Sequence, residues 1–322
     1  MSSSSSSSAD DSRPYDLVLW GATGFTGGLI VQYVANKVRK ARELAKAGDL
    51  SGSFRSDLAL RWAIGGRSRS KLEQTRSSLG EDFDNDANVG ILVADTGNVE
   101  SIDALTRSTK VILSTVGPFL LYGRPLVESC VRNGTHYVDI TGETPFVKSM
   151  IEDFHDTCKE KRIIMVPMSG FDSQPSDLGT FMVVDHIRRK YNCGTKNVRN
   201  FCEFQGGGSG GTIASIINLV STTSLKDFRD PFVLNPKDSR PALTSADNDQ
   251  MFPSYDNKSK TWTTPFLMAG ANTRVVRRSQ ALLGEKASYG EDFRYQETQK
   301  TEGAGEAYIM AIFLLIFGIT IS

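Results

Sequence analysis

Short apolar runs alternate with stretches whose apolar residues recur at helical spacing through the first half of the chain. The apolar runs predict strands, and the periodic stretches between them predict helices. Strands are expected at 17–20, 58–64, 89–94, 111–115, 137–140 and 163–167, and helices at 28–44, 71–79, 99–107, 126–132 and 145–161. Regular strand and helix alternation of this kind is typical of an α/β fold, in which a doubly wound parallel sheet has helices on both faces.

Beyond residue 168 the alternation ends and turn residues become frequent. Ser176 is expected to cap a helix over 177–191. Further strands are predicted at 198–205 and 262–268, helices at 213–220 and 275–283, and a long loop at 227–260. We therefore expect four regions, namely a disordered Ser-rich tail (1–14), a Rossmann domain (15–168), a second α+β substrate domain (169–304) and an apolar C-terminal segment (305–322).

The first predicted strand runs into a turn that reads Gly21-Ala22-Thr23-Gly24-Phe25-Thr26-Gly27. In nucleotide-binding βα turns the first glycine permits the turn, the second lets the backbone approach a pyrophosphate, and the third lets the helix pack closely. Free amides at the start of the helix then face the anion. The spacing G-x-x-G-x-x-G differs from the more familiar G-x-G-x-x-G, and a purely structural glycine turn is the alternative.

The second predicted strand, 58–64, is followed by Gly65-Gly66-Arg67-Ser68. Folds that bind NAD usually place an Asp or Glu here for the ribose 2′-hydroxyl. A guanidinium and a hydroxyl instead suit a 2′-phosphate, so NADP(H) is favoured over NAD(H). The alternative is that both side chains are solvated at the start of the next helix. An insertion at 49–56 also places this strand end farther along the sequence from the glycine turn than the usual ~20 residues.

The next two strand ends contribute the remaining cofactor candidates. Asp95 follows the third strand and Val116-Gly117-Pro118 follow the fourth. Because ligands of doubly wound sheets lie beyond the carboxyl ends of the strands, we expect Asp95 near the adenine and 116–118 near the nicotinamide. For Asp95, a helix N-cap is the competing interpretation.

Composition narrows the class of protein. Lys plus Arg and Asp plus Glu both number 37, a balance that argues against nucleic acid as the main partner. The four cysteines form no C-x-x-C pair and no His stands at metal-ligand spacing, so we expect reduced cysteines, an intracellular protein and no metal. The N-terminal serines have no apolar core, so neither a secretory signal nor a transit peptide fits.

Taken together, several motifs resemble the saccharopine dehydrogenase-like oxidoreductase family, which is related to the trans-acting enoyl reductases. They are Gly21 to Gly27, Gly66-Arg67-Ser68, Val116 to Phe119 with Tyr122-Gly123, Asp139 to Glu143, Gly170 to Ser173, Asp177 to Gly179, Gly211-Thr212 with Ser215, and Val275 to Arg278. The resemblance implies a Rossmann domain that binds a nicotinamide cofactor and a second domain whose sheet covers the active site. Members of the family are typically longer, so the resemblance also predicts a C-terminally truncated chain.

The residues that carry the chemistry leave no strong acid–base motif in the sequence, because hydride transfer is chemistry of the cofactor. Candidate proton donors are Tyr122, Asp139, Glu143 and Asp172, and for the carboxylates a cap or loop-bracing role is the alternative. Successive backbone amides around Ser209, Gly211 and Thr212 can form an anion-binding nest, which predicts that this loop holds a polar part of the substrate.

Three functions follow from these observations. The first is an NADP(H)-dependent oxidoreductase that acts on a hydrophobic or lipid-linked substrate in lipid or glycolipid metabolism. The second is a non-catalytic Rossmann protein at membranes or lipid droplets, and the third is saccharopine reduction in lysine metabolism. The segment 308–321 has no charge and no polar face, which predicts shallow insertion at a membrane or lipid-droplet surface. Mitochondria are among the candidate locations.

Overall fold

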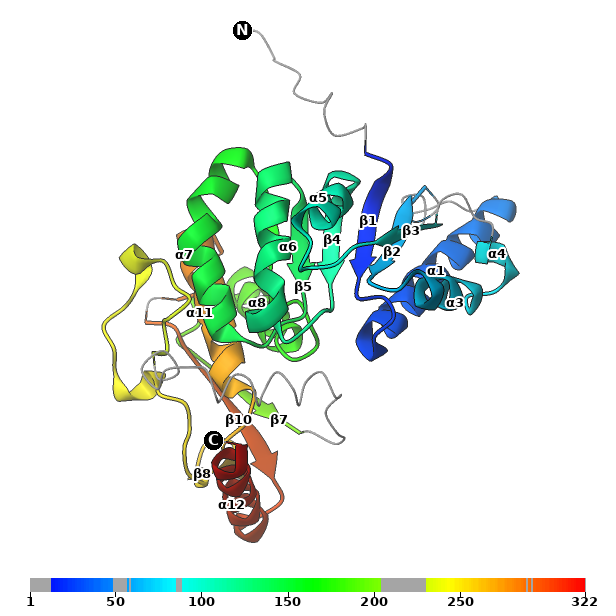
Figure 1. The fold of residues 1–322 in the computed structure, drawn as a ribbon. Coiled ribbons are helices and arrows are strands. Elements are labelled where there is room, and N and C mark those ends of the chain that lie inside the picture. The colour runs from blue at the N-terminus through cyan, green and yellow to red at the C-terminus, as the bar shows by residue number, and fades with distance from the viewer. Residues whose placement is uncertain are drawn as a thin grey trace, which may run out of the picture. The chain divides into compact units, whose positions relative to one another are not determined.

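The computed structural model describes residues 13–48, 57, 59–84, 89–203, 230–287, 289–290 and 292–321. The chain folds into two compact units. Unit 1 consists of residues 1–140 and 153–167, and unit 2 of residues 141–152 and 168–322. Each unit has a sheet of its own (Figure 1).

Unit 1 contains a six-stranded sheet with the order β3-β2-β1-β4-β5-β6, in which every pairing is parallel. The strands are β1 (Tyr15–Trp20), β2 (Trp62–Gly66), β3 (Val89–Val93), β4 (Thr109–Ser114), β5 (His136–Asp139) and β6 (Met165–Val166). This order is that of Rossmann folds, in which the first and fourth strands lie side by side. The doubly wound parallel sheet expected from the sequence is confirmed.

The helices of this alternation are α1 (Phe25–Lys46), α3 (Arg69–Ser77), α4 (Glu81–Asp84), α5 (Val99–Arg107), α6 (Phe119–Asn133) and α7 (Thr144–Lys161), the last of which contributes to both units. The predicted bounds of α5 are confirmed. The predicted start of α6 at residue 126 is wrong, because the helix begins at Phe119 and contains Pro125. Pro118 is its N-cap, and Gly134 ends it in the left-handed region at φ 67°.

Apolar side chains of β1 pack against both layers of helices. Leu19 belongs to a core shared with Val31 and Val38 of α1 and Leu72 of α3. Val18, its neighbour, points to the opposite face, as successive strand residues must. There a Cβ on Gly65 would touch both Val18 and Leu105 of α5. Burial on both faces explains why β1 reads as a continuous apolar run.

Unit 2 contains a four-stranded sheet with the order β7-β10-β9-β8. Its strands are β7 (Asn197–Cys202), β8 (Ser254–Asp256), β9 (Thr261–Thr264) and β10 (Arg294–Thr301). The pair β7 and β10 is parallel, and the other two pairs are antiparallel. The sequence did not predict β10, and it placed β8 within a loop. Both strands carry mostly polar residues, so neither produces an apolar pattern.

Three long helices accompany this sheet, namely α8 (Gln174–Tyr191), α11 (Ala269–Ala287) and α12 (Ala304–Ile321), together with short 3-10 turns at Lys237–Ser239 and Ser245–Asp247. The N-cap position of α8 is Ser173, whose side chain makes no cap hydrogen bond, so the predicted cap at Ser176 is wrong. The hydroxyl of Ser176 donates instead to the carboxylate of Glu297 over 2.9 Å. Helix α11 begins six residues before the predicted start, at Ala269.

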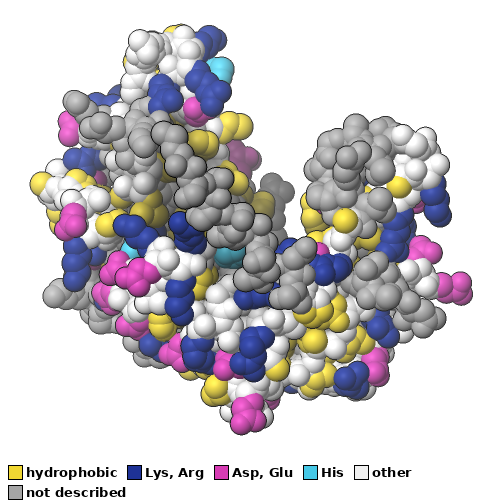
Figure 2. Space-filling view, turned by 90° about the horizontal axis from the view of Figure 1, so that it is seen from above, with side chains coloured by type: hydrophobic (Ala, Val, Ile, Leu, Met, Phe, Trp, Pro, Cys, Tyr) yellow, Lys and Arg dark blue, Asp and Glu magenta, His cyan; other side chains and the backbone are white. Residues whose placement is uncertain are grey.

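The apolar segment at the C-terminal end forms α12, which packs against β9 and β10. Ala307 is fully buried there, and the ring of Tyr308 lies 6.4 Å from that of Trp262. No helix in the described part of the chain combines the length and the hydropathy that are needed to cross a bilayer. On the face of the molecule drawn in Figure 2, basic and acidic side chains are interspersed.

Candidate functional site: the glycine turn of unit 1

The turn that follows β1 is held by backbone hydrogen bonds to its own chain and to β2. Gly21 has φ +90°, a conformation that side-chain-bearing residues rarely adopt. Its amide and that of Ala22 donate to the carbonyl of Gly65, over 3.0 and 3.2 Å. The amide of Gly24 then donates to the carbonyl of Gly21 over 3.0 Å, which closes the turn. The predicted strand, turn and helix are therefore present.

The three glycines meet different surroundings. A Cβ on Gly27 would lie 2.1 Å from the carbonyl oxygen of Gly21, so this glycine allows α1 to pack against the turn. A Cβ on Gly21 would lie 2.7 Å from both Thr115 and Val116. By contrast, a Cβ on Gly24 would meet only the Gly21 oxygen, at 3.4 Å, and Gly24 is exposed. Open space above Gly24 is what the approach of a pyrophosphate requires.

Gly24 is also the N-cap of α1, in an extended conformation. Because glycine has no side chain, it supplies no hydroxyl or carboxylate to the first amides of the helix. The free amides of Phe25, Thr26 and Gly27 and the positive end of the helix dipole both attract an anion at this position. Thr23 and Phe25 beside them are exposed. The predicted residues of the turn thus form an open, uncapped helix N-terminus that suits a phosphate group.

Thr115 braces the turn from the neighbouring strand, and sequence reasoning did not single it out. Its hydroxyl lies 3.1 Å from the carbonyl oxygen of Trp20 and 3.3 Å from that of Gly21. Its backbone amide donates to Trp20 over 2.9 Å. One residue therefore connects the end of β4 to the end of β1. The sequence analysis placed Thr115 at the end of the fourth predicted strand and indicated neither of its partners.

Arg67 and Ser68 follow the end of β2, beside the glycine turn, because β1 and β2 are paired neighbours. Arg67 is exposed and has no ion pair or hydrogen bond among the described residues. Ser68 is the N-cap of α3, where its hydroxyl accepts from the amide of Lys71 over 3.5 Å and lies 3.2 Å from that of Ser70. The guanidinium of Arg67 is thus available to a ligand, whereas the hydroxyl of Ser68 also serves the helix.

Asp95 lies at the end of β3 and is exposed. Its carboxylate accepts from the amide of Gly97 over 2.8 Å, which shapes the loop before α5. The N-cap of α5 is Asn98, whose side chain accepts from the amide of Ser101 over 3.0 Å. The competing interpretation of Asp95 as a helix cap is therefore wrong. Its assignment to the adenine stays a prediction.

Residues 116–118 lie beyond the end of β4, which pairs with β1 up to the contact between Trp20 and Ser114. All three are partly buried, and the peptide bond between Gly117 and Pro118 is cis. A methyl group of Val116 closely approaches Gly21. The structure therefore brings together the glycine turn, the end of β2 and the end of β4, as expected for a cofactor site at the carboxyl edge of the sheet.

The candidate proton donors differ in accessibility. Tyr122, on α6, is 46% exposed. Asp139 is fully buried at the end of β5, where it accepts from the hydroxyl of Tyr137 over 2.9 Å. Burial, followed by the charge of Asp139, holds the pKa of Tyr137 well above its ordinary value. Of these two residues in unit 1, only Tyr122 can reach a ligand from solvent.

The other two candidates belong to unit 2. Glu143 is buried, and its amide donates to the hydroxyl of Thr141 over 3.0 Å. Asp172 is exposed on the loop before α8. The predicted substrate residues Ser209, Gly211 and Thr212 lie outside the described residues, and their role stays a prediction. In the described part of the chain, no group of three or more His, Cys, Asp or Glu residues is arranged to hold a metal ion.

A parallel sheet of this order with an open glycine turn defines a Rossmann-type dinucleotide-binding protein. The family model of the saccharopine dehydrogenase NADP-binding domain matches residues 17–166, which include the turn, Arg67 and residues 116–118. The cofactor is therefore NADP(H), and the residues present fit it.

Sequence relatives match this chain over residues of both units. A trans-acting enoyl reductase of Mycobacterium bovis is 32% identical over 315 residues, which cover 93% of this chain and 68% of the relative. The saccharopine dehydrogenase-like oxidoreductase of Rattus norvegicus is 30% identical over 286 residues, 86% of this chain and 62% of the relative. The chain belongs to the saccharopine dehydrogenase-like oxidoreductase family and is an oxidoreductase.

One solved structure with a similar fold is apo saccharopine dehydrogenase from Saccharomyces cerevisiae. It has a TM-score of 0.39 and 15% sequence identity, and the match covers 58% of this chain and 34% of that one. The assignment to the family does not depend on this likeness. It depends on the sequence relatives, of which this chain spans about two thirds of the length.

Proposed function

We propose that this oxidoreductase transfers hydride between NADPH and a hydrophobic, lipid-linked substrate that carries an enoyl group. The names of the mycobacterial relatives support the enoyl group, which is a carbon–carbon double bond conjugated to a carbonyl. When bound, the reduced nicotinamide supplies the hydride. The protein must bind the cofactor, orient the substrate and provide a proton for the second carbon of the double bond.

The residues of unit 1 divide these tasks. The amides at the start of α1 bind the pyrophosphate, and Arg67 binds the 2′-phosphate as a charged, bidentate donor. Residues 116–118 lie beside the nicotinamide, next to Gly21. Tyr122 is the donor that we favour, because its phenol is accessible and α6 begins directly after Pro118.

The observation that carries the lipid part of the proposal is the outward face of α12. Residues with the spacing i, i+3, i+4 and i+7, beginning at Ala307, are buried or partly buried. The opposite side presents large apolar residues, with Tyr308 53%, Ile309 69%, Ile312 55% and Leu315 64% exposed. A helix whose solvent side is this apolar is unusual for a soluble surface, where polar residues normally face water.

We therefore propose that α12 lies in the interface of a membrane or lipid droplet, with this face toward the acyl chains. Partial insertion of such a face removes apolar area from water without a spanning helix. A substrate that is itself part of a lipid would be met at the same surface. Under this proposal, a glycolipid precursor is one candidate substrate and a mitochondrial membrane is one candidate location.

The reaction is tested by following NADPH absorbance with a long-chain 2-enoyl thioester, a short-chain 2-enoyl thioester, and 2-oxoglutarate with lysine. We expect the long-chain compound to be reduced faster than the short one, because the proposed substrate is hydrophobic. Tyr122→Phe should lower kcat with little change in KM. Activity only with the oxo acid and the amino acid, whose imine is reduced to saccharopine, would replace the proposal with the lysine-metabolism alternative.

The location is tested by flotation with phosphatidylcholine vesicles and with triacylglycerol-cored droplets. We expect the full chain to float and the double variant Ile309→Glu/Ile312→Glu to stay at the bottom. Met251→Glu/Phe252→Glu is the matched control, because these residues are 73% and 79% exposed outside α12. If all three proteins behave alike, α12 is not the lipid-binding element.

A further inference from the structure

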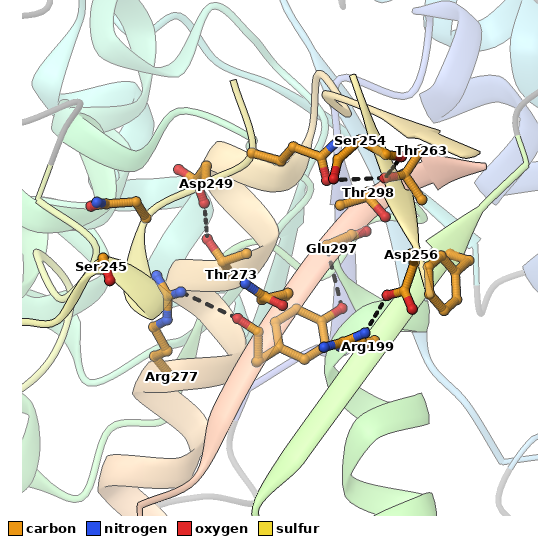
Figure 3. A pocket seen from close by; sticks show the side chains of 15 residues that line it. Arg199, Ser245, Asp249, Ser254, Asp256, Thr263, Thr273, Arg277, Glu297 and Thr298 are labelled. Carbon is orange, nitrogen blue, oxygen red and sulfur yellow. Dashed lines mark hydrogen bonds and ion pairs between the residues drawn. The ribbon is translucent and has the colours of Figure 1, made fainter. Parts of the chain in front are cut away.

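Unit 2 contains a polar cavity of about 300 Å³ that none of the functions above uses (Figure 3). It lies where β9 and β10 separate, since β9 pairs only with residues 299–301 of β10. The space beside the first half of β10 is closed by the segment 245–250 and by one side of α11. At about 30 Å³ for each water of the liquid, the cavity has room for about ten waters. That is comparable with the number of non-hydrogen atoms in a monosaccharide.

One face of the sheet forms the floor of this cavity. Gln296 and Thr298 of β10 are level with Arg199 and Phe201 of β7, so the four side chains project from the same face. Thr263 of β9 joins them as a further lining residue. Phe201 is the one lining residue whose side chain cannot make a hydrogen bond. A cavity with such a lining favours a polar occupant over a hydrocarbon.

The charged residues of the wall are largely paired with each other. Arg199 forms an ion pair with Asp256, and Asp249 forms one with Arg274, which lies just behind the wall. Figure 3 shows the first of these pairs across the floor of the cavity. These four charges therefore cancel within the protein.

The remaining two charges are opposite in sign and hydrogen-bonded elsewhere. Arg277, 4% exposed, donates to the carbonyls of Pro231, Asp247 and Tyr295 over 3.1, 2.9 and 3.2 Å. Glu297, 3% exposed, accepts from neutral side chains, among them the hydroxyl of Tyr295 at 3.2 Å. With Arg274 included, the wall has three guanidinium groups and three carboxylates. The net charge of the wall is therefore zero, which disfavours a phosphate or a polycation as the occupant.

Several neutral side chains at the cavity make no hydrogen bond to another side chain or to the backbone in the described ranges. They include those of Asn248, Gln296 and Thr298. Thr298 is nevertheless only 9% exposed, so its hydroxyl faces the cavity rather than the outer surface. Groups of this kind require a partner that both donates and accepts.

We propose that this cavity is a binding site for a neutral, polyhydroxylated molecule of monosaccharide size. Each hydroxyl of such a molecule both donates and accepts, which matches a wall of amides, hydroxyls and internally neutralised charges. A zwitterion fits less well, because its two charges would need Arg277 and Glu297, whose hydrogen bonds are already made. All of the residues that line the cavity belong to unit 2.

The test uses the full chain without NADPH and four neutral probes, namely D-glucose, D-galactose, D-mannose and myo-inositol. Saturation-transfer NMR detects binding, and titration calorimetry gives the dissociation constant. Glycine, L-glutamate and inorganic phosphate are tested in parallel. We expect saturable binding of at least one neutral probe and none of the charged compounds. Binding of none of the four, or of a charged compound in preference, overturns the proposal.

Two variants place the binding in this cavity. Gln296→Leu and Thr298→Val keep the shape of the side chain and remove its hydrogen bonds, so each should weaken binding about two- to tenfold. Gln299→Leu is the matched control, because it makes the same change on the same strand at a residue that does not line the cavity, and it should leave binding within twofold. Equal affinities for all four proteins would locate the bound probe elsewhere and overturn the proposal.

Discussion

The strands β1 and β10 lie inside the two sheets, and half of the residues of each are buried, but for different reasons. In β1, Val18, Leu19 and Trp20 are at most 2% exposed and pack against apolar helix faces. In β10, Glu297, Thr298 and Thr301 are at most 9% exposed and are polar. Apolar burial stabilises the first sheet, whereas hydrogen bonds and ion pairs stabilise the second. An apolar pattern therefore reveals the first kind of strand and not the second.

The polar interior of unit 2 centres on the carboxylate of Glu297. One of its oxygens accepts from Ser176 over 2.9 Å and from Asn272 over 3.0 Å. Burial, followed by the charge of Glu297, raises the pKa of the phenol of Tyr295 and that of the thiol of Cys202. No cation in the described ranges forms an ion pair with Glu297. The carboxylate thus depends on neutral donors from α8, α11 and the sheet.

The largest expected effect lies in unit 1, at Gly27. A methyl group there would lie 2.1 Å from a backbone oxygen, so Gly27→Ala should lower the free energy of unfolding by at least about 3 kcal/mol. Gly24→Ala meets its nearest atom at 3.4 Å and should cost less than about 1 kcal/mol. Urea unfolding in a Trp262→Phe background, where tryptophan fluorescence reports unit 1, measures both.

At Gly24 the expected effect is on cofactor binding and not on the stability of the fold. Gly24→Val should remain folded and lose NADPH binding, because its side chain would occupy the space above the turn. Thermal unfolding with and without NADPH measures this. If NADPH still protects Gly24→Val, the turn is structural only.

The second effect concerns the polar core. Glu297→Leu leaves several buried donors without an acceptor, so we expect a loss of roughly 2–4 kcal/mol. Glu297→Gln keeps one acceptor oxygen and should lose about half as much. Hydrogen exchange of the β10 amides measures the change, and the β1 amides are the internal control. Similar exchange in wild type and Glu297→Leu would mean that apolar packing, and not this network, stabilises unit 2.

The third effect is at Arg67. Loss of a charged bidentate contact should weaken NADPH binding by roughly 1.5–3 kcal/mol in Arg67→Ala, which is about 10- to 150-fold. NADH has no 2′-phosphate, so its affinity should stay the same. Arg69→Ala is the control, since Arg69 is exposed and lies 3.7 Å from Glu73. Equal losses for both cofactors would show that Arg67 does not read the 2′-phosphate.

The smallest effect is a pH dependence in β1. Hydrogen bonds from Arg61, followed by the contact with Lys110, lower the pKa of Asp16 to about 2. A pKa below the unfolded value of about 3.9 means that the charged form stabilises the fold above pH 4, and that this stability is lost as the pH falls toward 2. Because solvent screens the pair, Asp16→Asn should cost only about 1 kcal/mol at pH 7. The difference from wild type should shrink below pH 4, and a constant difference would contradict the assignment.

The elements that make up the candidate cofactor site could be predicted from the sequence because their signals are local. The glycine turn, the exposed Arg67 and the end of β4 each follow a short apolar strand, and parallel strands bring their carboxyl ends to one edge. The bracing hydroxyl of Thr115 was not accessible, because its partners at Trp20 and Gly21 are almost a hundred residues away. The role of Ser176 was also missed, since its partner Glu297 is 121 residues away.

The sequence by itself determined the Rossmann sheet and the NADP(H) turn, because apolar periodicity and glycine conformation act over a few residues. Only the tertiary structure decided that β10 lies inside the sheet of unit 2 and that a polar cavity lies beside it. Polar side chains are stabilised inside a protein only by specific partners. For Glu297, Arg277 and Arg294, those partners come from distant segments, and folding alone brings them together.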